Sequence, residues 1–301
     1  MIFIYIIITL VVIIILFIQY FAPRFMVQLR GGIFSFNKSS RIDLGHPDDF
    51  FLNNEKLEII TKDNIYLSAY LIKTKQNEQK GTIILLHGIR SNKENNLLLS
   101  KKLSDIGYNS VIVDLRAHGA SSGKYCTFGF YEKHDIVSLI NTLFTLNNLN
   151  LNIGIWGQSL GSAVSLQVLE TDKRLKFGII ESVFSDFNTI SHDYFKRYIG
   201  FEIPFITNYI IKRAEKIANF KANEIKPYIS AKNITIPVLV AHSIDDEKVN
   251  FKYGKTIFNN LQSTKKEFIE IKGATHSNLR DIGGEKYFKK VFKFIEKQYN
   301  K

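Results

Sequence analysis

Residues 154 to 161 read Gly-Ile-Trp-Gly-Gln-Ser-Leu-Gly and end in a G-x-S-x-G pentapeptide centred on Ser159. This is the pattern of a nucleophile elbow, in which a strand turns sharply into a helix and presents a serine hydroxyl. Such a turn strains the backbone, so small residues are needed at 157 and 161 for the strand and helix to pack closely. Because so short a pattern also arises by chance, the sequence around it has to decide whether Ser159 is a nucleophile.

Eight stretches around the pentapeptide are predicted strands, and most of the later ones are continuous runs of Val, Ile and Leu. Strands of this kind are buried on both faces, as in a mostly parallel sheet with helices on both sides. The first two strands are separated by a short turn at Asp63-Asn64, so we expect an antiparallel start followed by β-α-β units in one domain over 51–301. The predicted strands are 56–61, 65–72, 81–86, 109–115, 151–156, 177–183, 236–241 and 267–272, and the predicted helices are 94–105, 131–146, 160–171, 251–261 and 285–298.

The first 22 residues contain no charged side chain and are long enough to span a bilayer as a helix. A cleaved signal peptide would need a basic start, a shorter apolar core and small residues at the cleavage site, and this segment has none of them. We therefore expect 1–22 to be an uncleaved transmembrane anchor with Tyr20 and Phe21 at the interface. The segment 23–50, which mixes Gly, Ser, Asn, Pro and Asp, is predicted to be a membrane-proximal linker.

The charges that follow the anchor predict its orientation. Four basic residues come before the first acidic residue, Asp43, and no basic residue precedes the apolar segment. The positive-inside rule then places the large C-terminal part in the cytoplasm. An uncleaved bacterial export signal would instead place it outside, and this alternative stays open. The four basic residues are Arg24, Arg30, Lys38 and Arg41.

The composition argues against several other classes of protein. The net charge is +12, but the basic residues are spread along the chain rather than clustered with aromatic residues, so we expect no nucleic-acid partner. A basic surface facing anionic lipid fits the apolar N-terminus better. The single cysteine, Cys126, forms no intramolecular disulfide and is expected to be a bystander. No two histidines show metal-ligand spacing with a third ligand nearby, so we expect neither a metal nor a cofactor.

A serine needs a base within hydrogen-bond reach and a carboxylate that orients the base. In an elbow of this type the chain order is Ser, then Asp or Glu, then His. The predicted strand Pro-Val-Leu-Val-Ala-His is followed by Asp245 and Asp246, which compete for the role of the acid. The next strand leads into a loop with His276, the expected base. Because carboxyl ends of parallel strands meet at one edge of a sheet, both groups are expected near Ser159.

The chain also offers an oxyanion site made of backbone groups. The strand at 81–86 ends in His87-Gly88-Ile89, and the N–H of Ile89 is one expected donor. The N–H of Leu160, directly after the nucleophile and at the start of a helix, is the second. Losing one such donor typically costs about 2.7 to 4 kcal/mol of transition-state stabilisation, so this loop matters as much as the acid and base.

Together these motifs resemble a known family. They are Ile-Leu-Leu-His-Gly at 84–88, Val-Asp-Leu-Arg-Ala-His-Gly-Ala-Ser-Ser-Gly at 113–123, the elbow pentapeptide, the late Asp-Asp pair and Gly-Ala-Thr-His at 273–276. Over residues 50–298 the chain resembles the α/β-hydrolase superfamily, and within it the membrane-anchored serine hydrolases of the serine aminopeptidase and monoacylglycerol lipase-like group. The resemblance implies an α/β-hydrolase fold, with a mostly parallel central sheet, helices on both faces and a small lid insertion.

The resemblance also bears on the acid. In that family the acid lies four residues after a strand-end histidine, in a His-Gly-x-x-Asp-x-x-Val pattern. Carried onto residues 242–249, the pattern selects Asp246, although Ser243 stands where the family usually has glycine. Asp245 remains an alternative. Asp186 is a third, because some relatives place the acid after the preceding strand.

The segment 187–232 is longer than a crossover between two strands requires and is rich in aromatic residues. Its position after the carboxyl end of a strand favours a lid or cap over a pocket. Ordinary helical packing is the alternative.

The sequence therefore predicts a serine hydrolase that cleaves an ester, thioester or amide through an acyl-enzyme, with Ser159 as nucleophile, His276 as base and Asp246 as acid. The anchor and the aromatic insertion favour a lipid-like or acylated small-molecule substrate near the membrane. A serine peptidase remains an alternative, because the resemblance extends to peptidases. A catalytically silent binding or scaffold protein on the same fold is the alternative from another class.

Overall fold

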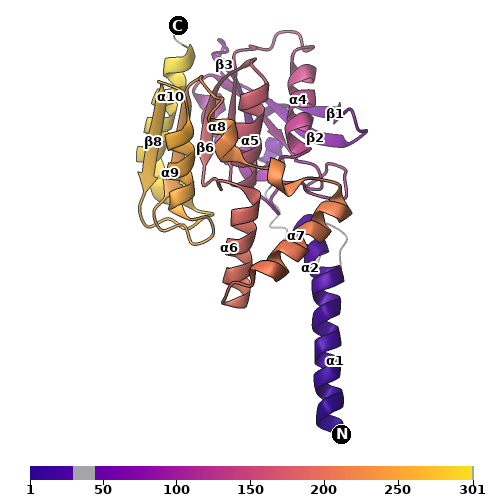
Figure 1. The fold of residues 1–301 in the computed structure, drawn as a ribbon. Helices are drawn as coiled ribbons and strands as arrows, with labels where there is room; N and C mark the ends of the chain where they lie inside the picture. Colours follow the sequence, from indigo (N-terminus) through magenta and orange to yellow (C-terminus); the bar gives the residue numbers. More distant parts are fainter. Residues whose placement is uncertain (30–44, 300–301) are drawn as a thin grey trace.

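The structure is a computed structural model that describes residues 1–29 and 45–299. Its N-terminal part is one helix over Ile2–Val27, made of α1 (Ile2–Leu16), the π-helical turn η1 (Phe17–Phe21) and α2 (Ala22–Val27). This helix is long and apolar enough to cross a membrane. Figure 1 shows α1 projecting away from the rest of the molecule.

The prediction of membrane orientation depends largely on charges that the structure does not describe. Arg30, Lys38, Arg41 and Asp43 lie outside the described residues, whereas Arg24 lies in α2.

Eight strands form one sheet in the order β1-β2-β4-β3-β5-β6-β7-β8. β2 pairs antiparallel with β1 and β4, and the other neighbours are parallel. Each predicted strand overlaps one of these strands, which confirms the mostly parallel sheet with an antiparallel start. The strands are β1 (Asn53–Ile60), β2 (Tyr66–Lys73), β3 (Gly81–Leu86), β4 (Tyr108–Val113), β5 (Ile153–Gln158), β6 (Leu175–Glu181), β7 (Val238–Ser243) and β8 (Lys266–Ile271).

Helices cover both faces of the sheet, as the continuous apolar strands predict. Every residue of β3, β4 and β7 is buried, whereas β1 at the edge has exposed positions. α3 and α10 pack on one face, and α4, α5, α8 and α9 pack on the other. The helices are α3 (Leu97–Asp105), α4 (Glu132–Leu143), α5 (Leu160–Thr171), α8 (Pro227–Ala231), α9 (Phe251–Asn260) and α10 (Leu279–Tyr299), and two short 3-10 turns are η2 (Pro47–Phe50) and η3 (Lys93–Asn96).

The segment 187–232 leaves the sheet after β6 and returns before β7. It contains α6 (Phe187–Ile199), α7 (Pro204–Ala218), the 3-10 turn η4 (Ala222–Glu224) and α8. α8 packs against the sheet-covering helices α5 and α9. By contrast, α6 and α7 extend beyond the edge of the sheet, on the side where α1 leaves the domain (Figure 1).

The start of the expected linker is ordered. Val27 is fully buried in the hydrophobic core, and its carbonyl oxygen accepts a hydrogen bond from the Cys126 N–H at 2.8 Å. α2 also packs against α7. The apolar face of α2 is thus covered by the domain, which explains why this part of 23–50 is helical although its composition predicts an irregular lead-in.

Candidate active site

Ser159 lies between the end of β5 and the start of α5, with φ 52° and ψ −112°. This conformation is strained for a residue other than glycine and is typical of a nucleophile elbow. The neighbouring glycines are required by packing. A Cβ at Gly157 would lie 2.3 Å from the carbonyl carbon of Gly161, and one at Gly161 would lie 2.4 Å from the carbonyl oxygen of Leu86. Backbone atoms cannot move aside, so no side chain fits at either position.

His276 lies in the loop after β8 and faces the serine. Its Nε2 is 2.9 Å from Ser159 Oγ, and its Nδ1 is 2.8 Å from Asp246 Oδ2. Ser159 is 8% exposed and His276 is 9% exposed, so this chain of hydrogen bonds is largely shielded from water. With Nδ1–H donating to the carboxylate, Nε2 is free to accept the proton of the serine hydroxyl.

Asp246 is held in the turn after β7 by several donors. Its Oδ1 accepts hydrogen bonds from the N–H groups of Lys248 and Val249, both at 2.9 Å. Burial by itself raises the pKa of this carboxyl, but hydrogen bonds from His242 and His276 outweigh it and hold the pKa well below the usual range. Asp246 therefore stays ionised at neutral pH and can orient a histidine.

The other two candidate acids have different partners. Asp245 Oδ2 accepts the N–H of Gly273 at 2.6 Å, which ties the acid turn to the loop of His276. Asp186 caps α6, because its Oδ1 accepts the N–H of Thr189 at 2.8 Å. Of the three acids considered from the sequence, the structure brings Asp246 to His276.

Ser243, the departure from the family pattern, has a local role. Its hydroxyl donates to the carbonyl oxygen of Ala274 at 2.5 Å and accepts from the N–H of Asp245 at 3.2 Å. Glycine could make neither bond. The serine thus links the acid turn to the loop of His276 by an additional contact.

Sequence reasoning missed Glu247. Its Oε2 accepts the backbone N–H of His276 at 3.0 Å, so it fixes the main chain that carries the His276 ring. Its own carbonyl oxygen accepts a hydrogen bond from Arg197 in α6. The signal available in the sequence was the run of three acids at 245–247, each of which contacts the loop at 273–276.

The two expected oxyanion donors lie beside Ser159. Leu160 is the first residue of α5, and a Cβ at Gly88 would lie 3.6 Å from the Ser159 Cβ, so the loop with Ile89 packs against the serine. Within the part of the chain that the structure describes, neither N–H is bonded to a protein acceptor. Both groups are therefore available to a ligand oxygen.

His87 fixes the oxyanion loop from behind. Its Nδ1 donates to the carbonyl oxygen of Gly88 at 2.7 Å, and its Nε2 accepts from the N–H of Leu115 at 3.1 Å. Burial lowers its pKa, so the ring stays neutral and keeps both bonds. The adjacent carboxylate of Asp114 accepts from Lys93 Nζ at 2.8 Å in a buried ion pair. These groups brace the loop and do not contact Ser159.

Other reactive groups show no catalytic arrangement. Cys126 is buried, and burial raises its pKa, so the thiol stays protonated. Over residues 1–29 and 45–299 no three His, Cys, Asp or Glu side chains are grouped as metal ligands.

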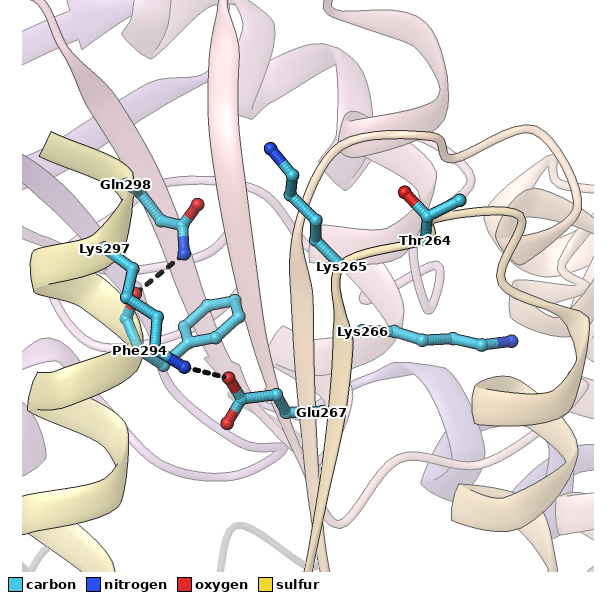
Figure 2. A pocket seen from close by; sticks show the side chains of 7 residues that line it. All are labelled: Thr264, Lys265, Lys266, Glu267, Phe294, Lys297 and Gln298. Carbon is cyan, nitrogen blue, oxygen red and sulfur yellow. Dashed lines mark hydrogen bonds and ion pairs between the residues drawn. The ribbon is translucent and has the colours of Figure 1, made fainter. Parts of the chain in front are cut away.

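A surface hollow lies between the start of β8 and the end of α10 (Figure 2). Its walls are joined by an ion pair of 2.8 Å between Lys297 Nζ and Glu267 Oε1. The start of β8 lies at the opposite end of the parallel strands from their carboxyl ends, where Ser159 lies. This hollow is therefore separate from the site at Ser159. It is lined by Thr264, Lys265, Lys266, Glu267, Phe294, Lys297 and Gln298.

Comparison with protein families gives one match that covers most of the chain. Residues 100–301 match the model of the prolyl oligopeptidase family, Peptidase S9. The matched region contains the elbow, the acid turn and the loop of His276.

Two relatives of similar sequence are informative. The chain is 27% identical over 227 residues to the uncharacterized protein YqkD of Bacillus subtilis (strain 168), a region covering 73% of this chain and 72% of YqkD. It is 27% identical over 204 residues to the lysophosphatidylserine lipase ABHD12 of Gallus gallus, a region covering 63% of this chain and 49% of ABHD12. The chain thus spans about half the length of ABHD12.

Among solved structures, the esterase Pf2001 of Pyrococcus furiosus superposes with a TM-score of 0.71 and 22% sequence identity. The superposition covers 85% of this chain and 95% of the esterase. At this identity the likeness shows the fold alone, and it confirms the predicted α/β-hydrolase fold.

Proposed function

The chain belongs to the prolyl oligopeptidase family of α/β-hydrolases, and from this premise we propose that it is a membrane-anchored serine hydrolase acting through Ser159, His276 and Asp246. The observation that supports the proposal is the shielded chain of hydrogen bonds from Ser159 Oγ through His276 to Asp246. In the proposal, the N–H groups of Ile89 and Leu160, which have no backbone acceptor among the described residues, stabilise the charge that develops on the substrate oxygen.

In the proposed reaction the Ser159 oxygen attacks the carbonyl carbon of an acyl substrate while its proton moves to His276 Nε2. The carbonyl oxygen becomes an oxyanion that the N–H groups of Ile89 and Leu160 stabilise. Collapse of this intermediate breaks the bond to the leaving group, which takes the proton from His276. Water then attacks the acyl-enzyme by the same route and releases the acid product. Asp246 stabilises the imidazolium formed in each half.

We propose that the substrate is an ester-linked, lipid-like acyl compound. An apolar helix that can cross a membrane directly precedes the domain, and the insertion next to the site carries exposed aromatic rings. ABHD12, which this chain resembles over about half of the length of ABHD12, is described as a lysophosphatidylserine lipase. The family description favours the second candidate, a peptidase.

Labelling with a fluorophosphonate probe tests the nucleophile. Membranes that contain the wild-type chain should give a labelled band of its size, and the Ser159→Ala variant should give none. The matched control is Ser162→Ala, because Ser162 is the next serine along the chain and its hydroxyl lies 2.7 Å from the carbonyl oxygens of Gly157 and Glu181, to one of which it donates, rather than at His276. Labelling that persists in Ser159→Ala would contradict the assignment of Ser159 as the nucleophile. Absence of labelling in the wild type would favour a catalytically silent protein.

A substrate panel separates the two enzyme classes. We expect p-nitrophenyl esters to be cleaved with a higher kcat/KM than aminoacyl anilides. Among the esters, kcat/KM should rise with the length of the acyl chain. A preference for the anilides would favour the peptidase instead.

The proposed location is the membrane, with the hydrolase domain in the cytoplasm. Protease treatment of sealed vesicles of known orientation tests this. Digestion of the domain only from the cytoplasmic side supports the proposed orientation, and digestion only from the other side contradicts it.

A further inference from the structure

The end of α6, the loop after it and the start of α7 expose a concentration of large apolar side chains, which we term the insertion tip (residues 198–209). Single exposed apolar residues are normal in proteins, but a contiguous group marks a surface for a partner. The side chains of this group are between 43% and 75% exposed. They are Tyr198, Ile199, Phe201, Phe205 and Tyr209.

The pattern along α7 is that of a helix lying at a boundary between apolar and polar surroundings. The inward face is buried at Thr207, Ile210, Ile211 and Ala214. The outward positions 205, 209, 212 and 216 follow helical spacing, and they change from Phe and Tyr to two lysines. An aromatic end followed by a basic end suits a helix that dips one end into a bilayer interface.

The contact of α7 with the apolar N-terminal helix indicates how deep α7 would lie in a bilayer that this helix crosses. At 1.5 Å per residue, about 20 residues cross a hydrocarbon core of about 30 Å. Counted from Ile2, these residues end within η1, so α2 emerges at the interface. Arg24, the first charged residue of the chain, lies in α2. α7 packs against both η1 and α2, and α6 extends toward the same side as α1 (Figure 1).

The charge around the tip fits anionic lipid. Between residues 196 and 216 the chain carries five basic and two acidic side chains. One of the acids, Glu202, is within 3.1 Å of His192, and the other, Glu215, is within 3.5 Å of Lys212. The surface next to the exposed rings is therefore positive, which attracts the headgroups of anionic lipids.

We propose that the insertion tip is seated in the interface of the bilayer that α1 crosses, with its aromatic rings among the acyl chains and its lysines at anionic headgroups. This inference rests on the membrane anchorage proposed above. It adds a contact of the domain with the membrane besides the N-terminal helix.

The seating places the active site next to lipid. α6 connects the tip to the domain: Arg197 donates to the carbonyl oxygen of Glu247 in the turn of Asp246, and Asp193 accepts from the hydroxyl of Tyr253 in α9. Glu247 in turn holds the main chain of His276. An acyl substrate in the bilayer would thus meet the insertion before it reaches Ser159, and would not have to cross water.

Tryptophan fluorescence in proteoliposomes tests the seating. The only native tryptophan, Trp156, is fully buried, so a Phe201→Trp variant adds one reporter to a constant background. The matched control is Phe144→Trp, at an exposed position after α4 on the opposite edge of the sheet. We expect lipids with brominated acyl chains to remove most of the emission that F201W adds, and more completely in vesicles of phosphatidylcholine with phosphatidylglycerol than in phosphatidylcholine alone. Emission added by F144W should not change.

Each contrary outcome identifies what fails. If the variants do not float with the vesicles, both the anchorage and the seating are overturned. If they float but F201W is quenched no more than F144W, the seating alone is overturned. The emission from F201W could instead shift to shorter wavelength without quenching by the lipids, and this shift could grow with the amount of protein per vesicle. That result would indicate that a second copy of the chain covers the tip. None of these readings depends on hydrolase activity.

Discussion

The proposed catalytic loops, which carry Ser159, Asp246 and His276, and the insertion tip both lie beyond the carboxyl ends of the parallel strands (Figure 1) but are built in opposite ways. In the catalytic loops, Ser159, Asp246 and His276 are each less than a tenth exposed and bonded to one another. In the insertion tip, Phe201 is 59% exposed and Phe205 is 75% exposed. Polar groups that perform chemistry must be oriented in advance, whereas apolar groups that meet a lipid surface must be left uncovered. The difference predicts that substitutions in the loops affect rate or folding strongly and that substitutions in the tip do not.

The largest expected effect separates the two adjacent acids. Asp246→Asn should lower kcat for a short p-nitrophenyl ester by about 10⁴-fold, because the orienting charge is lost and the imidazole tautomer changes. Asp245→Asn keeps an oxygen that can accept the N–H of Gly273 and should lower kcat by less than about tenfold. Steady-state kinetics of the two purified variants measure this. Equal losses would mean that the wrong acid has been assigned.

The next largest difference is expected in stability, between a glycine substitution at the elbow and one in the tip. Gly161→Ala places a methyl group 2.4 Å from the carbonyl oxygen of Leu86 and should destabilise the fold by at least about 3 kcal/mol. Gly200→Ala has open space and is strained only by its φ of +91°, so about 1 kcal/mol is expected. The Tm of each variant in detergent is the measurement. A Gly161→Ala variant as stable as Gly200→Ala would contradict the close contact of strand and helix.

The positioning role of Glu247 predicts a smaller effect on rate. Glu247→Ala removes the acceptor of the His276 N–H and should lower kcat about tenfold with little change in KM, as expected for about 1.4 kcal/mol of lost positioning. Glu247→Gln retains an acceptor oxygen and should recover most of the rate. A loss that appears in KM, or that glutamine does not recover, would argue against this role.

The depressed pKa of Asp246 predicts how stability depends on pH. A carboxylate whose pKa falls on folding contributes stability above its unfolded pKa of about 4, and this contribution is lost as pH falls through the folded value. The Tm of the wild type minus that of Asp246→Asn should therefore decrease from neutral pH to about pH 3. A difference that stays constant over this range would contradict an ionised Asp246 in the folded protein.

The smallest effect is expected in the tip. Phe201→Ser should change the free energy of unfolding in detergent by less than about 0.5 kcal/mol, because the ring is already exposed. Thermal unfolding of the detergent-solubilised variant measures it. Substantial destabilisation would mean that the ring packs against the domain and is not available to lipid.

The local patterns of the sequence were sufficient for most of the fold. All eight strands, the antiparallel start and the mostly parallel sheet follow from apolar runs and turn residues. Strand ends were displaced by a few residues, and α10 begins at Leu279, earlier than the predicted helix at 285–298. The helix α2 was not predicted, because Val27 is buried by segments distant in the chain, including the one that contains Cys126.

By itself, the sequence determined the sheet, the elbow and the chain order of the proposed nucleophile, acid and base, because periodicity and glycine spacing act over a few neighbouring residues. The resemblance to a family had already selected Asp246, and the tertiary structure shows its carboxylate at His276. Only the tertiary structure decided what the Ser243 hydroxyl bonds to and what Glu247 holds. It also decided that the insertion tip lies beside the apolar N-terminal helix. The contacts among the loops join residues 29 to 31 positions apart, and α7 packs against η1 and α2 at the other end of the chain, so no local pattern encodes them.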